Sequence, residues 1–107
     1  MDIKEARKQI DSIDAVLVRE FEKRLTLIKE IGKYKDEHHL PLVDEERDKS
    51  IIDLHSNSCE NKDLAPYIEN YLKTVVSMSN EFLKNICISI YSLLACQVLV
   101  KLQSVKY

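Results

Sequence analysis

Residues 32–48, GKYKDEHHLPLVDEERD, bring together charged side chains that could hold a ligand. The stretch contains Gly32, the only glycine of the chain, and it ends one helical pattern before another begins. Five charged residues are expected around this corner: Lys33, Lys35, Asp44, Arg47 and Asp48. One interpretation is a carboxylate and a guanidinium held rigidly toward a ligand. The alternative is a helix N-cap with local ion pairs, worth roughly 0.2–0.5 kcal/mol each.

Two more cations, Arg24 and Arg7, lie in the helical pattern that precedes this corner. Arg24 interrupts the apolar spacing and stands eleven positions before Lys35, so both lie on nearly the same helix face. Arg7 stands seventeen positions before Arg24, about 25 Å along the axis, and cannot share a small pocket with Lys35 of its own chain. It could share one with Lys35 of an antiparallel partner helix. The alternative is that all three are solvated helix cations.

The composition is typical of one soluble domain built from helices. The 107 residues include one glycine and two prolines, which is too little turn chemistry for many short strands. A formal charge of −2 gives no reason to expect nucleic acid or a membrane as a partner. The three cysteines, Cys59, Cys87 and Cys96, match no zinc spacing and are interpreted as reduced cytosolic thiols. No signal-peptide pattern is visible at the N-terminus, so we expect a cytoplasmic protein. We also expect neither a metal nor a cofactor.

A very long helix is predicted from about residue 2 to residue 36. Apolar residues recur there at steps of mostly three and four, and Asp2 with Glu5 forms a capping pair. Such a helix is about 50 Å long, whereas a compact domain of this size has a radius of gyration of about 13 Å. Its apolar stripe therefore needs cover from a partner chain, and we expect a two-fold homodimer.

Two further helices are predicted after the corner. Asp44 is a good N-cap for a short middle helix, and Pro66 suits the first turn of a long C-terminal helix after a loop at residues 57–65. The stripe of that last helix contains Ser79. Residues 85–100 carry no charge, and we expect them to extend the third helix into the dimer interface, with an aggregation-prone β-rich tail as the alternative. The run is shorter than the ~18 residues of a membrane span.

Together these residues resemble the all-helical (AroQ-class) chorismate mutase family. That family carries a lysine shortly after a glycine, a loop with proline, and then Asp followed by Arg-Glu, where this chain has Arg47-Asp48. The resemblance covers about residues 3–83 of a single domain, 1–107, and leaves the role of residues 85–107 open. It implies an all-α fold of three helices that forms an intertwined homodimer. The site residues that it implies are Arg7, Arg24, Lys35, Asp44, Arg47, Asp48, Ser79 and Leu83.

The resemblance implies an isomerase of the shikimate pathway, in aromatic amino acid biosynthesis, which converts chorismate to prephenate. This pericyclic rearrangement needs no nucleophile, metal or cofactor. It is accelerated by holding the reactive conformer and by placing positive charge at the breaking ether bond. The arginines Arg24 and Arg47, with Arg7 of the other subunit, would bind the two carboxylates, and Lys35 would face the ether oxygen.

The remaining implied roles are polar contacts around the same ligand. Ser79 would contact a substrate carboxylate, and Asp44 would orient the corner. Asp48 stands where the family has a glutamate that contacts the substrate hydroxyl, and it is one methylene shorter.

Leu83 departs from the family pattern more seriously. The family has a glutamine or glutamate there, which donates to the ether oxygen, and leucine cannot donate. Loss of one such donor typically costs on the order of 10²–10³ in rate, so we expect a slow mutase. Lys84 lies about 100° around the helix and is the nearest candidate for a substitute, because Glu81 lies on another face.

Two alternative functions stay open at this point. An isochorismate-pyruvate lyase of the same fold would use the same cations on a similar dicarboxylate. A non-catalytic helical module would bind chorismate or only dimerise, and Leu83 favours that interpretation.

Overall fold

The computed structural model describes the backbone of residues 1–105 and the side chains of residues 1–86. In chain order it contains α1 (Ile3–Glu37), α2 (Glu45–Asn57), the 3₁₀ turn η1 (Lys62–Leu64) and α3 (Ala65–Val105). Across residues 1–105 there is no strand, so the prediction of three helices is confirmed. The predicted loop at residues 57–65 is wrong in part, because α2 includes residue 57 and η1 occupies three positions.

Both predicted N-caps are present. The carboxylate of Asp2 accepts a hydrogen bond from the backbone nitrogen of Lys4 at 3.0 Å, and Asp44 accepts from the backbone nitrogen of Arg47 at 3.1 Å. Each bond satisfies one of the amide groups that a helix leaves unpaired at its start. The Asp44 cap fixes where α2 begins and therefore where its first-turn side chains lie.

The end of α1 is a Schellman motif built on a histidine. His39 has a φ of 55°, its backbone nitrogen donates to the carbonyl of Asp36, and Leu40 donates to the carbonyl of Lys35 at 2.8 Å. Glycine usually takes this left-handed position, because a β-carbon is strained there. The motif turns the chain sharply just before Pro41, which sets the direction of the loop to α2.

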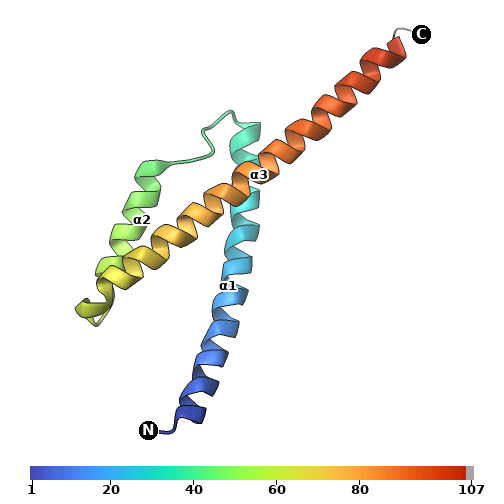
Figure 1. The fold of residues 1–107 in the computed structure, drawn as a ribbon. Coiled ribbons are helices and arrows are strands. Elements are labelled where there is room, and N and C mark those ends of the chain that lie inside the picture. Colours follow the sequence, from blue (N-terminus) through green and yellow to red (C-terminus); the bar gives the residue numbers. More distant parts are fainter. Residues whose placement is uncertain (106–107) are drawn as a thin grey trace.

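The three helices form an open arrangement rather than a closed bundle. α1 and α3 cross near the C-terminal end of α1, and α2 lies along the first half of α3 (Figure 1). The two ends that project furthest are the N-terminal half of α1 and the C-terminal half of α3 (Figure 1). The chain measures 77 × 33 × 17 Å with a radius of gyration of 20.3 Å, against about 13 Å for a compact domain of this length.

The described side chains enclose only a small core. Leu83, Val75 and Val76 are its buried hydrophobic members, between 5% and 7% exposed. In contrast, the apolar stripe in the N-terminal half of α1 is open to solvent, with Ile13 57% and Leu17 44% exposed. The long first helix therefore has an apolar face that none of the side chains described among residues 1–86 covers, as its length predicted.

α3 stays helical through Val105, so the β-rich tail considered from the sequence is wrong. The side chains of residues 87–107, with Cys87 and Cys96 among them, lie outside the described residues, and the predicted burial of this tail in an interface stays a prediction. None of the described helical stretches combines the length and apolarity needed to cross a bilayer.

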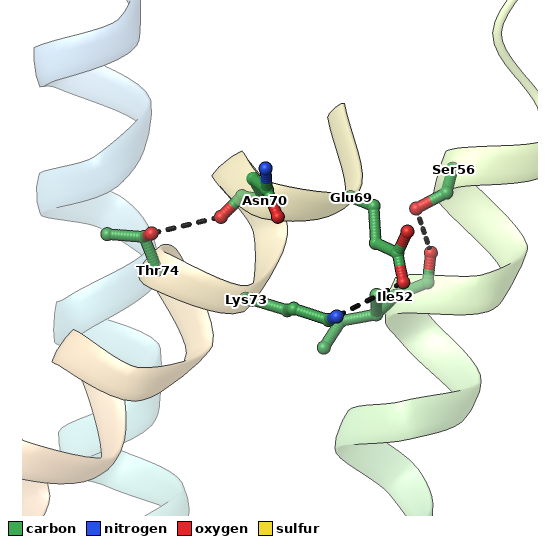
Figure 2. A network of polar contacts seen from close by, with 6 residues as sticks. All are labelled: Ile52, Ser56, Glu69, Asn70, Lys73 and Thr74. Atoms are coloured by element: carbon green, nitrogen blue, oxygen red, sulfur yellow. Dashed lines mark hydrogen bonds and ion pairs between the residues drawn. The ribbon is translucent and has the colours of Figure 1, made fainter. Parts of the chain in front are cut away.

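Where α2 packs beside α3, several polar side chains form contacts within their own helix. On α3, Lys73 and Glu69 form an ion pair at 3.2 Å, beside Ile52 of α2 (Figure 2). The hydroxyls of Ser56 and Thr74 donate to carbonyls one turn earlier in their own helices, at 2.6 and 2.9 Å (Figure 2). The bond of Ser56, which is buried, satisfies its hydroxyl proton within α2, whereas Thr74 is exposed.

Candidate active site

A cavity of about 530 Å³ lies where the C-terminal half of α1, the loop after it, the start of α2 and the middle of α3 meet. Six of the eight site residues predicted from the sequence line it: Arg24, Lys35, Asp44, Arg47, Asp48 and Leu83. The rest of its wall is mostly aliphatic, from residues such as Ile28 and Ile51. Three cations and two carboxylates on an apolar wall are suited to binding a small polar anion.

Arg24 is held by Ser79 across the α1–α3 crossing. The Nη1 atom of Arg24 donates to the Ser79 hydroxyl oxygen, and that hydroxyl donates its own proton to the carbonyl of Val75 at 2.7 Å. Ser79 is 1% exposed and does not line the cavity, so it lies behind Arg24. The serine fixes the guanidinium on the cavity wall, and its single proton is already used within α3.

Lys35 closes the cavity at the end of α1. Its ammonium nitrogen donates to the backbone carbonyl of Leu42 at 3.2 Å, in the loop that leads to α2. An ammonium group has three protons, so this bond leaves two for a ligand. The same contact ties the loop to α1 and holds the lysine half-buried.

The first turn of α2 presents Asp44, Arg47 and Asp48 to the cavity. Asp44 is occupied as the N-cap, whereas the Asp48 carboxylate accepts a hydrogen bond from Nδ2 of Asn80 at 3.1 Å. Arg47 is exposed, and its backbone rather than its guanidinium makes the cap contact. The sequence predicted the first three residues as a group, but it gave no role to Asn80.

Leu83 lies at the base of the α1–α3 crossing, 5% exposed, and also lines the cavity. Its Cδ1 atom would be 2.2 Å from a β-carbon on Gly32, so the two helices approach closely because residue 32 has no side chain. An aliphatic side chain is therefore present at the position that the family resemblance assigns to a hydrogen-bond donor.

Several residues considered from the sequence lie away from this cavity. Lys33 is exposed and does not line it. Lys84 and Glu81 line a second cavity of about 780 Å³ on the other side of the α2–α3 pair, so Lys84 does not replace the donor missing at Leu83. Arg7 is exposed and lies 28 positions before Lys35 on the same helix, about 42 Å along the axis.

Sequence reasoning missed three polar groups of the cavity: Asn80, His55 and the carbonyl of Leu42. Asn80 follows Ser79 directly, and its distance of three residues from Leu83 was a usable signal, because such residues share a helix face. A backbone carbonyl in a loop leaves no trace in the residue types, so the Leu42 contact had no comparable signal.

One family profile and two curated proteins match this chain. A family profile described as chorismate mutase type II matches residues 6–84. A T-protein of Haemophilus influenzae is 34% identical over 82 residues, which cover 74% of this chain and 22% of that protein. A T-protein of Enterobacter agglomerans is 35% identical over 74 residues, which cover 68% of this chain and 20% of that protein.

The chain thus spans about a fifth of the length of these curated relatives, and no solved structure gives a significant match. The family match covers most of the chain, ends one residue after Leu83, and includes the whole cavity described above. The resemblance seen in the sequence is thereby confirmed: the chain belongs to the chorismate mutase type II family, a family of isomerases.

Proposed function

We propose that this chain catalyses the rearrangement of chorismate to prephenate, a step of aromatic amino acid biosynthesis. The observation that carries the proposal is the convergence of Arg24, Lys35 and Arg47 on one cavity within a chain of this family. The substrate has two carboxylates, a hydroxyl and an ether bond that breaks, and the cavity supplies a partner of suitable charge for each. The proposed reaction is a pericyclic rearrangement within one molecule, which transfers no electron or group to a carrier and so requires no cofactor.

Catalysis in this proposal is electrostatic and conformational. Arg24, held by Ser79, binds one carboxylate of the substrate. Arg47, on the first turn of α2, binds the same substrate from another wall of the cavity. Lys35 donates to the ether oxygen with protons that its bond to Leu42 leaves available. Charge placed there before reaction stabilises the transition state more than the ground state.

Ser79 has a different part in this proposal from the one that the resemblance gave it. Its proton is donated to Val75 and its oxygen accepts from Arg24, which supports an indirect role. We assign it to the positioning of Arg24 rather than to direct contact with a carboxylate. Asp44 fixes the start of α2, and Asp48 accepts from the substrate hydroxyl.

The active protein is proposed to be an intertwined homodimer in which Arg7 completes the other subunit's site. Support comes from the exposed apolar stripe around Ile13 and Leu17 and from the large radius of gyration. Arg7 lies too far along α1 to reach the cavity of its own chain. An antiparallel second α1 would cover the stripe and carry Arg7 toward Lys35 at once.

The direct test follows chorismate loss and prephenate formation spectroscopically. The wild type should turn over, and Lys35→Ala should lower kcat by at least about 10²-fold, the usual effect of removing one transition-state donor. Lys33→Ala is the matched control, because Lys33 is an exposed lysine two positions away that does not line the cavity. Equal activity of Lys35→Ala and the control would contradict the assigned role of Lys35.

The shared site is tested by mixing two inactive variants, Arg7→Ala and Lys35→Ala. In a mixed dimer, one site combines the intact Arg7 of the Lys35→Ala subunit with the intact Lys35 of the Arg7→Ala subunit. The other site lacks both residues. Random exchange of subunits should therefore restore roughly a quarter of the wild-type activity. If the mixture stays as inactive as its components, the two residues do not act in one intersubunit site.

The absence of a donor at Leu83 favours a second candidate, a module that binds chorismate without turning it over. It differs from the first in one measurable way. Chorismate would raise the melting temperature of the wild type while no prephenate forms, and Arg24→Ala would remove the rise.

A further inference from the structure

Asn80 links α3 to α2 at the edge of the candidate active site. Its Nδ2 atom donates to Oδ2 of Asp48 at 3.1 Å, and both residues are half-buried. Both also line two cavities, the 530 Å³ cavity with Lys35 and the 780 Å³ cavity with Lys84. The Asn80–Asp48 pair therefore forms a wall that the two cavities share.

Asn80 is the hydrogen-bonding side chain that α3 contributes to the cavity. Among the α3 residues whose side chains are described, Asn80 and Leu83 line it, and leucine has no polar atom. The amide of Asn80 uses one donor on Oδ2 of Asp48 and leaves Oδ1 available as an acceptor. The bond also joins two helices, so it restricts the rotamers of a carboxylate that solvent would otherwise leave mobile.

We propose that Asn80 is a positioning residue. It holds the Asp48 carboxylate through Oδ2, so that Oδ1 of Asp48 accepts from the hydroxyl of the substrate. This inference rests on the proposed function. Asp48 is one methylene shorter than a glutamate, so its reach depends on a fixed direction. Asn80, on α3, fixes the direction of the Asp48 carboxylate on α2. The conformational entropy of that carboxylate is then lost on folding and not when the substrate binds.

The test is a double-mutant cycle on kcat and KM, with wild type, Asn80→Ala, Asp48→Ala and the double variant. Loss of a hydrogen bond to a charged group changes a rate or binding constant by about tenfold to hundredfold. Asn80→Ala should therefore lower kcat/KM by that factor. In the Asp48→Ala background the same change should cost less than about threefold, because the group that it positions is gone. Asn70→Ala, an exposed asparagine of the same helix, is the matched control and should leave kcat/KM unchanged.

The conservative change Asp48→Glu gives an independent readout. A longer carboxylate reaches the hydroxyl without being held, so Asp48→Glu should restore part of the activity that Asn80→Ala loses. A residue that only stabilised the fold would not show this rescue. If Asn80→Ala does not fold, Asn80→Asp keeps the shape, removes the donor and places like charges together, and it should lower kcat/KM at least as much.

Different outcomes separate this inference from the function on which it rests. If the wild type is active but Asn80→Ala costs the same factor with and without Asp48, Asn80 acts independently and the positioning role is overturned. If the wild type neither turns over chorismate nor binds it in a calorimetric titration, the proposed function fails and the inference fails with it. If the wild type binds without turnover, the same cycle is measured on the dissociation constant, with the same two expected factors.

Discussion

A β-carbon on Gly32 would lie 2.2 Å from Cδ1 of Leu83, so the only glycine of the chain makes room for the site residue that departs most from the family pattern. The two positions are coupled through the crossing of α1 and α3. A donor side chain at position 83 would bring its amide to this same buried contact. The packing of the helices and the chemistry of the cavity therefore depend on one pair of residues.

Gly32→Ala should lower the free energy of unfolding of the wild type by about 1 kcal/mol. Alanine gains about 1 kcal/mol over glycine inside a helix, but overpacking against buried Leu83 costs about 1–3 kcal/mol. In the Leu83→Ala background the clash is absent, so the same change should stabilise by about 1 kcal/mol. Urea denaturation of the four proteins at one protein concentration measures both effects. Stabilisation of equal size in both backgrounds would show that the contact is not a tight one.

Leu83→Gln should raise kcat by roughly tenfold or more, because it returns a donor to the cavity wall near Lys35. It should also lower the free energy of unfolding by about 1–3 kcal/mol, since a buried aliphatic group is replaced by an amide. Steady-state kinetics and urea denaturation give the two numbers. Leu83→Met, which has similar volume and no donor, is the control. A gain in kcat with methionine would assign the effect to packing instead.

Ser79→Ala should raise KM by about tenfold or more and leave the fold intact. It removes the acceptor of the Arg24 guanidinium, and a hydrogen bond to a charged group is worth about 1.5–3 kcal/mol. Ser77→Ala removes an exposed serine from the same helix and serves as the control. Chorismate kinetics or calorimetric binding provides the measurement, and unchanged KM would mean that Arg24 needs no support from α3.

His39→Gly should stabilise the protein by about 1 kcal/mol. His39 occupies the left-handed position of the Schellman motif, where a β-carbon costs about 1–2 kcal/mol and glycine costs little. Part of the gain is lost because glycine makes the unfolded chain more flexible. Thermal and urea unfolding test this, with His38→Gly as the neighbouring control. That control should destabilise, since His38 stacks on Tyr34 and bonds to its carbonyl.

Local signals in the sequence predicted the helices well. Asp2 and Asp44 act through bonds to amides two or three residues away, so their role follows from residue type and position. The period of the apolar residues in α1 set its length to within a residue or two. The 3₁₀ turn before Ala65 was missed, because its three residues carry no periodic pattern.

The candidate site was predictable where a side chain interrupts an apolar stripe, as Arg24 and Ser79 do. Their contact joins residues 55 positions apart, and each residue alone had an ordinary explanation. The spacing of Asn80 from Leu83 could have placed it on the cavity side of α3, but its contact with Asp48 depends on where α2 packs on α3. Its bond to Asp48 could be found only once the two helices were placed.

The small core of the described chain bears on how the protein behaves at low abundance. Three hydrophobic side chains are buried among residues 1–86, while the stripe of α1 is open. If a second copy covers that stripe, folding and association become one equilibrium and obey mass action. Dilution would then act as a denaturant, and each tenfold drop in concentration would remove about 1.4 kcal/mol from the stability of the dimer. The amount of the chain in its compartment would set the fraction that is folded as well as the number of active sites.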